Sequence, residues 1–520
     1  MNIKLLLPIL LAVYIVFISY NLLGLPLYID EGLYIFWAFL FRDNPGFAYV
    51  SMQDGKTPLF IWLTYYFNPL LNNYLLTGRL ISAAASVVTL ICSSMIAWRI
   101  FGKKTALFVY ILFLITPFNI LISRMAFVDS LLIAFGTLSI LSLILLREFA
   151  EKKGIALSVL FASLTGVFLG LAFMTKTTAR LFLVGEVLVI ILWGLSYIKD
   201  KKFKTAGILA ISLGLIIGLY YEILGYIRIG ALRYWDMIAV KESDLVFSLP
   251  EILNNITGRG AAHIYFESIP LYVEYLAVYF GVILVFGIIG LYKIIKDRKQ
   301  FWLVVLLLIF STAVLLSAKI TASRYFSIII PIFIIISATG LNFIWQGKSR
   351  ILKGFSVALI IISFGFSLRM VADPINATYA RDDRSYFIES DINALGLIES
   401  IEILKPRSDD SIVGIEASWG VQEGMATSFG EAGIESQLIN NVVPTSPSTD
   451  TICADGYKEG LDECWRANFR DIPKSLKNHK YIYLTATQKQ MELLDKISDF
   501  KIEREFRRPT GITSYLIKLN

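Results

Sequence analysis

The sequence predicts an α-helical polytopic membrane protein with about eleven transmembrane helices and a C-terminal extracytoplasmic α/β domain. Apolar residues make up 56% of the 520 positions, and charged residues only 17%. A soluble protein has about a quarter of its residues charged. The apolar residues gather in runs of about 20, which is the length that crosses a bilayer as a helix. After residue 371 these runs stop, and the composition becomes that of a soluble domain.

Eleven apolar segments satisfy the length criterion for a span. They cover residues 4–23, 79–100, 104–122, 127–146, 155–174, 180–198, 205–224, 272–292, 301–317, 326–345 and 354–371. The first segment lacks a small-residue cleavage site, so we expect it to be retained as a span rather than removed as a signal peptide.

Lysine and arginine gather in every second connection between these spans. The clusters lie at residues 99–104, 147–153, 199–204, 293–299 and 348–353. The positive-inside rule assigns them to the cytoplasm. We therefore expect a cytoplasmic N-terminus, an external C-terminal domain and a location in the plasma membrane. The net charge of +7 follows from this topology and does not indicate a nucleic-acid partner.

Two connections on the outer side are long. The loop at 24–78 contains two short apolar and aromatic stretches, Leu33–Phe41 and Pro58–Leu71, which we expect to be helices lying at the membrane interface. The loop at 225–271 mixes polar and aromatic residues, as a flap over a cavity would. Both belong to a predicted membrane domain at 1–371.

The segment 372–520 predicts a small α/β domain. SIVGIEAS, KYIYLTAT and ITSYLIKL are typical of strands, and the stretches at 386–404 and 486–497 are typical of helices. Cys453 and Cys464 lie in this external segment, where they could close a short disulfide loop or remain free thiols.

Several charged residues are predicted to lie on the outer face of the membrane domain. Asp30 and Glu31 follow the first span, Lys56 lies in a Gly-Lys-Thr-Pro turn, and Asp129 and Arg324 follow later. The ordinary interpretation is that the two acids begin a helix at Gly32 and that the cations reach the lipid headgroups. The alternative is a shared site for acid–base chemistry and anion binding.

A family resemblance favours the second interpretation. The pair DE after the first span and the stretches GKTPLF, TGRLISAAAS, RIFGKKTALF and ISRMAFVDSLLIAF resemble the protein O-mannosyltransferase and aminoarabinose transferase branch of the GT-C glycosyltransferases. GLAFMTKTTA and SRYFSIIIP are similar to later stretches of this group. The resemblance covers about residues 20–345. It departs from the family at Thr57, where a proline often follows the lysine.

This resemblance implies that a sugar moves from a polyprenyl-phosphate carrier to a hydroxyl of a protein, lipid or glycan, with inversion at the anomeric carbon. Asp30 is then the general base, and Glu31 orients the acceptor or acts as the base instead. Lys56 and Arg324 stabilise the departing phosphate. We expect these acids and cations to line one apolar cleft.

Three further residues are candidates for supporting roles. Asp129 either supports the site or forms a structural ion pair with Arg124, and Lys176 either supports the site or anchors to headgroups. A divalent cation could bind weakly at Asp30 and Asp129, since carboxylates suit such ions. No other cofactor is expected.

Two other functions are compatible with many spans and polar outer loops. One is a transporter or flippase for a lipid-linked sugar. The other is an oligosaccharide transferase or ligase of the same superfamily. A transporter usually carries charged or helix-breaking residues near the midplane of two related halves. Here the charges gather at one surface and no internal repeat is evident, which favours a transferase.

Overall fold

The computed structural model divides the chain into two compact units. The first unit comprises Met1–Leu22, Asn44–Leu63 and Arg79–Ala380, and the second comprises Leu23–Asp43, Thr64–Gly78 and Arg381–Asn520. The residues that the structure describes are 3–54, 56–152, 154–197, scattered positions between 205 and 227, 270–298, 300–317, 322–390, 392–406, 412–418, 420–439, 479–495, 499–508 and 512–519. The cysteines of the predicted disulfide, Cys453 and Cys464, and almost all of the loop predicted at 225–271 lie outside them.

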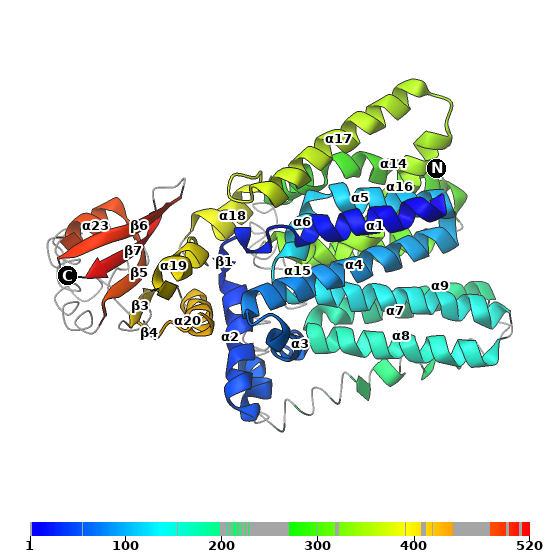
Figure 1. Ribbon diagram of the computed structural model, residues 1–520. Coiled ribbons are helices and arrows are strands. Elements are labelled where there is room, and N and C mark those ends of the chain that lie inside the picture. The colour runs from blue at the N-terminus through cyan, green and yellow to red at the C-terminus, as the bar shows by residue number, and fades with distance from the viewer. Residues whose placement is uncertain are drawn as a thin grey trace, which may run out of the picture. The chain divides into compact units, whose positions relative to one another are not determined.

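The first unit is built from long apolar helices, several of which run side by side (Figure 1). Its helices are α1 (Ile3–Ser19), α4 (Tyr74–Phe101, whose first turn belongs to the second unit), α5 (Lys103–Ile115), α6 (Pro117–Arg124), α7 (Val128–Glu151), α8 (Ile155–Thr175), α9 (Arg180–Tyr197), α14 (Gly281–Asp297), α15 (Phe301–Ser317), α16 (Ile330–Gln346) and α17 (Arg350–Ala372). The helix α3 (Leu59–Phe67) begins in the first unit and ends in the second.

Among the described residues, seven helices are long and apolar enough to cross a membrane, or eight if one bent pair counts as a single span. The protein is therefore a multi-pass membrane protein, as predicted. The number of eleven spans stays a prediction, because the segment predicted at 205–224 is described only at scattered positions.

The segment predicted as a span at 104–122 is bent. The structure breaks it between α5 and α6, which meet at an angle of 67°. Thr116 is extended there, and Pro117 begins the next helix. The cause is local, since a proline disfavours helical geometry in the residue before it and has no N–H of its own to donate.

Side chains replace the hydrogen bonds that the break removes. Asn119 Nδ2 donates to the carbonyl of Phe113, which lies four residues before the proline. Ser363 Oγ of α17 donates to the carbonyl of Ile115 at 2.7 Å. Backbone carbonyls in a lipid environment need such partners, so the bend is held by polar groups from two helices.

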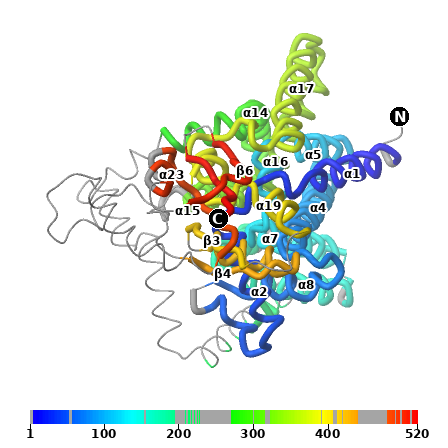
Figure 2. Tube along the Cα trace, turned by 60° about the vertical axis from the view of Figure 1, so that its left-hand side comes forward, coloured from blue at the N-terminus to red at the C-terminus, as the bar shows by residue number. Residues whose placement is uncertain are grey.

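The two helices α14 and α16 pack closely through glycine. A Cβ atom added at Gly290 would lie 2.0 Å from the carbonyl oxygen of Ile336, and one added at Gly340 would lie 2.0 Å from that of Phe286. Small residues of this kind let membrane helices approach each other. By contrast, the first turns of α17 stand clear of the other helices (Figures 1 and 2). Ile351 there is 84% exposed, as expected for a side chain that faces lipid.

The second unit contains the predicted α/β domain, so the predicted fold class is confirmed. Its five-stranded sheet has the order β4-β3-β5-β7-β6. The strands are β3 (Val413–Glu416), β4 (Ser436–Leu438), β5 (Tyr481–Thr487), β6 (Phe500–Arg507) and β7 (Ile512–Leu519). The pairs β3–β4 and β3–β5 are parallel, and β5–β7 and β6–β7 are antiparallel.

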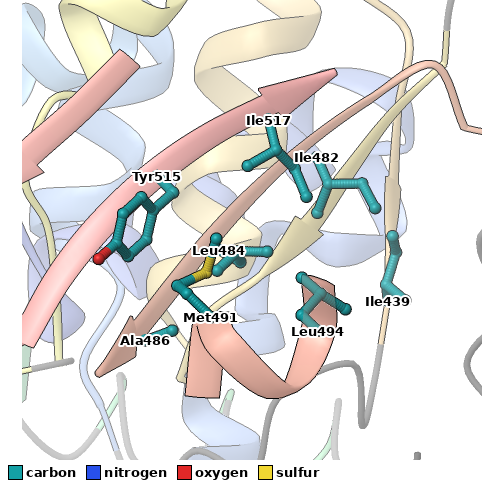
Figure 3. Packing of buried hydrophobic residues seen from close by; sticks show 8 residues of the cluster. All are labelled: Ile439, Ile482, Leu484, Ala486, Met491, Leu494, Tyr515 and Ile517. Carbon is teal, nitrogen blue, oxygen red and sulfur yellow. The ribbon is translucent and has the colours of Figure 1, made fainter. Parts of the chain in front are cut away.

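The core of this sheet lies under the helix α23 (Gln488–Asp495). Met491 and Leu494 of α23 reach the strand residues Ile482, Leu484 and Ile517 (Figure 3). Four of these five side chains are fully buried, and Met491 is 7% exposed. Burying such side chains stabilises the folded state by about 1.5–3 kcal/mol each.

The helix α2 (Ile29–Asp43) packs against α20 (Val421–Glu431) within the second unit. The short strand β1 (Leu27–Tyr28) precedes α2 and pairs with β2 (Asn393–Ala394). A Cβ atom added at Gly32 of α2 would lie 2.0 Å from the carbonyl oxygen of Gly420. Glycine at this position is therefore a condition for the packing of α2 on α20.

Replacing Gly32 with Ala is expected to lower the melting temperature. The added methyl group meets backbone rather than a flexible side chain, and overpacking of this kind costs about 1–3 kcal/mol or more. Thermal unfolding of the purified protein in detergent measures the effect. Gly430→Ala in α20 is the matched control, because nothing lies within 4 Å of a Cβ atom there. Equal melting temperatures for both variants would contradict this account.

A second contact of α20 involves the carboxylate of Glu431. Both of its oxygens accept the N–H of Tyr74 at 3.0 Å, and Asn68 Nδ2 lies 3.3 Å from Oε1. Tyr74 is the first residue of α4, where backbone N–H groups have no partner in the helix. Burial raises the pKa of Glu431, although the hydrogen bonds from Tyr74 and Asn68 oppose the shift.

This raised pKa predicts how stability changes with pH. The folded state holds the Glu431 proton more tightly than the unfolded chain, whose Glu pKa is about 4.3. The stabilisation that the protonated Glu431 gives to the folded state is thus complete below that pH. It is lost as the pH rises through the folded-state pKa. The wild-type protein should lose melting temperature relative to Glu431→Gln between pH 4 and pH 7. A constant difference in melting temperature between the two proteins across this range would refute the prediction.

Candidate active site

Asp30 and Glu31 occupy the first turn of α2, which begins at Ile29 rather than at the predicted Gly32. Glu31 is fully buried, and its Oε2 accepts the N–H of Tyr28 at 3.2 Å. A glutamate that reaches back to the residue before the helix is one half of a capping box. Glu31 thus has a structural role in starting α2. Asp30 is half-buried at the same helix end, where the helix dipole favours negative charge.

Asp129 and Lys176 form an ion pair in the first unit. Asp129 lies in the first turn of α7, and Lys176 connects α8 to the short helix Thr177–Ala179. The distance from Lys176 Nζ to Asp129 Oδ1 is 2.6 Å, and Asp129 is only 4% exposed. The alternative pairing of Asp129 with Arg124 is wrong.

Arg124 instead hydrogen-bonds to backbone carbonyls at the C-terminal end of α1. Its guanidinium donates to the carbonyls of Ile18, Tyr20 and Asn21. These carbonyls lie at or just after the last turn of α1, where a helix leaves its acceptors without partners. Because α6 bends away from α5, its last residue reaches α1 and not the carboxylate of Asp129. This geometry gives Arg124 a structural role.

Three cations from distant parts of the sequence converge on Tyr325. Lys56, Lys176 and Arg324 all act electrostatically on its hydroxyl group, and Arg324 also hydrogen-bonds to it. Lys176 Nζ lies 5.4 Å from the centre of the Tyr325 ring. The Arg324 guanidinium lies 5.6 Å from that ring and 5.7 Å from the ring of Phe127.

We call Lys56, Asp129, Lys176, Arg324 and Tyr325 the basic cluster. It contains three cations and one carboxylate, so its net charge is positive. Four of the seven predicted site residues therefore belong to this cluster. They are Lys56, Asp129, Lys176 and Arg324. A planar guanidinium with nearby ammonium groups suits a phosphate in a site that contains little water.

Two of the predicted site residues lie in the other unit. Asp30 and Glu31 belong to the second unit, whereas the basic cluster belongs to the first. Within the described ranges, no three His, Cys, Asp or Glu side chains gather where they could hold a metal ion. The weak divalent site at Asp30 and Asp129 stays a prediction.

Tyr325 is the member of the basic cluster that the sequence prediction missed. Interfacial tyrosines are common in membrane proteins, so its residue type alone carries little information. The available signal was its place directly after Arg324 in SRYF, where an aromatic ring can lie against a guanidinium.

Comparison with known proteins gives one family match by sequence. The sequence model of the dolichyl-phosphate-mannose-protein mannosyltransferase family matches residues 47–237, a range that contains Lys56, Asp129 and Lys176. A comparison with curated protein sequences finds no significant match.

Two solved structures of ArnT from Cupriavidus metallidurans share the fold. The apo structure is 12% identical, with a TM-score of 0.57 over 99% of this chain and 97% of that chain. The structure bound to undecaprenyl phosphate is 12% identical, with a TM-score of 0.58 over 98% of this chain and 97% of that chain.

The likeness in fold extends over nearly the whole of both chains, and the family match covers a membrane segment that supplies three members of the basic cluster. The family-like motifs from GKTPLF to GLAFMTKTTA lie along that same segment. The chain is thus similar to the dolichyl-phosphate-mannose-protein mannosyltransferase family over residues 47–237, and it shares the fold of ArnT over nearly its whole length.

Proposed function

We propose that this protein transfers a sugar from a polyprenyl-phosphate donor to a hydroxyl group of a protein, lipid or glycan on the outer face of the membrane. The observation that carries the proposal is the basic cluster, in which three cations meet around Tyr325. The likeness to a structure that holds undecaprenyl phosphate supports a donor of this chemical class.

The cations act on the leaving group. As the bond between the anomeric carbon and the phosphate oxygen breaks, negative charge grows on the phosphate. Lys56 and Arg324 stabilise that charge, and donors fixed in advance do so without the cost of reorientation. The ion pair with Asp129 holds Lys176 beside Tyr325. Asp129 is thus a positioning residue for this part of the site.

The carboxylate of Asp30 acts on the acceptor. It takes the proton from the acceptor hydroxyl while the oxygen attacks the anomeric carbon from the face opposite to the phosphate. One displacement of this kind inverts the anomeric centre, and the free polyprenyl phosphate leaves. Glu31 holds the start of α2 in place through Tyr28, and it thereby fixes the direction of Asp30.

A donor screen with the purified full-length protein tests this function. Synthetic undecaprenyl-phosphate donors carrying mannose or aminoarabinose are supplied with hydroxyl acceptors, and release of prenyl phosphate is followed together with the anomeric configuration of the product. We expect release with one donor and an inverted product. Movement of a donor across proteoliposomes without release of prenyl phosphate would instead identify a transporter.

A further inference from the structure

A cavity of about 300 Å³ lies in the first unit, at the ends of three helices. Residues from the last two turns of α4, α14 and α16 line it, together with Gln300, which directly precedes α15. None of the residues that line it belongs to the basic cluster. The adjoining connections carry the Lys and Arg clusters that the positive-inside rule assigns to the cytoplasm.

The wall of the cavity contains a buried polar atom with no partner. Asn342 of α16 is 8% exposed, and its Nδ2 donates to the hydroxyl of Thr105 at 3.1 Å. Its Oδ1 has no hydrogen-bond partner in the structure. The neighbouring hydroxyl of Thr339 donates to the carbonyl of Ile335 and is therefore engaged. A buried acceptor left unpaired is costly, so this wall suits a ligand that donates a hydrogen bond.

The charges in and around the cavity indicate which ligand groups it can bind. Three helix C-termini meet there, and each carries partial negative charge that attracts a cation or a donor. Lys293 and Asp297 form an ion pair at 2.9 Å in the lining, and both are accessible to solvent. Around this end lie exposed basic residues of the next connections. They are Lys103, Lys104, Lys296, Arg298, Lys348 and Arg350.

A phospholipid headgroup has both an anionic group and a hydrogen-bond donor, the two groups that this arrangement can bind. Its phosphate suits the basic residues around the cavity, and a terminal ammonium or hydroxyl group suits the acceptor inside. The apolar side chains of Ile100, Phe101 and Ile294 line the same cavity and can contact the carbon atoms of the lipid. We propose that this cavity binds the headgroup of a cytoplasmic-leaflet phospholipid that carries a hydrogen-bond donor, with ethanolamine as the preferred headgroup.

Short-chain lipids provide the test. Dioctanoyl phosphatidylethanolamine, phosphatidylglycerol or phosphatidylcholine is titrated into the full-length protein in detergent, and native mass spectrometry counts the retained lipid while the melting temperature is followed. Ethanolamine and glycerol headgroups have donors, but choline has none. We expect binding of the ethanolamine lipid to be about tenfold tighter than that of the choline lipid, the difference that one charge-assisted hydrogen bond makes.

Asn342→Leu keeps the size of the side chain and removes the acceptor. This variant should bind the ethanolamine lipid about tenfold more weakly. Ser337→Ala is the matched control, because this buried hydroxyl of α16 also has no partner but lies outside the cavity lining. Equal retention of the three lipids by the wild-type protein overturns the proposal, even where a variant fails to fold. So does unchanged binding to Asn342→Leu.

Discussion

Replacing Asp30 with Asn lowers the rate of sugar transfer by about 10²–10⁴-fold, the range that general base catalysis contributes. The amide has nearly the same shape as the carboxylate but cannot take the proton from the acceptor hydroxyl. Donor binding should change little, because the leaving phosphate is held by other residues. Release of prenyl phosphate under saturating donor measures the rate, and the donor KM measures binding.

Asp43 provides the control at the other end of the same helix. It is exposed and forms an ion pair with Arg42 at 2.8 Å, so Asp43→Asn should transfer sugar at the wild-type rate. A rate loss for Glu31→Gln combined with full activity of Asp30→Asn would transfer the role of base to Glu31. Full activity of both variants would remove the proposed acid–base site.

Replacing Arg324 with Met lowers kcat by about 10²–10³-fold, as the loss of one fixed donor to a developing anion does in other enzymes. Methionine retains much of the apolar contact with Phe127 and Tyr325 but has no charge. Lys56→Met should give a loss of the same order. The double variant should lose less than the product of the two single effects, because both cations act on one phosphate.

The control for charge is Arg350→Met, at the exposed start of α17. The Arg350→Met variant should transfer sugar at the wild-type rate. If Arg324→Met raised only the KM for the acceptor and left kcat intact, the basic cluster would bind the acceptor and not the leaving phosphate.

Of the five-stranded sheet, β3, β5 and β7 were predicted from the sequence, but β4 and β6 were not. The three predicted strands are mostly apolar and buried, so their local pattern identifies them. Strand β6 reads FKIEREFR and is largely exposed at one edge of the sheet. Its pairing with β7 provides the hydrogen bonds that define it, and a local pattern of charged residues does not reveal such a partner.

In the site, too, the local sequence pattern predicts some features, whereas others depend on contacts with distant residues. The sequence places Lys56, Lys176 and Arg324 on the predicted outer face, because their positions relative to the spans follow from hydropathy. It does not reveal that Asp129 pairs with Lys176 rather than with the predicted Arg124, because that pairing depends on the bend. The extended backbone at Thr116 changes the direction of α6. As a result, Arg124 hydrogen-bonds to the end of α1, and Asp129 forms its ion pair with Lys176.

The bond between Ser363 and Ile115 has a consequence for biosynthesis. The two residues are separated by 248 positions. At a translation rate of about 5–20 residues per second, the hydroxyl is made roughly 10–50 s after the carbonyl that needs it. During this interval another donor, such as water in the insertion channel, has to bond to the exposed carbonyl. The newly made bundle therefore reaches its finished hydrogen bonding only when one of its last membrane segments arrives.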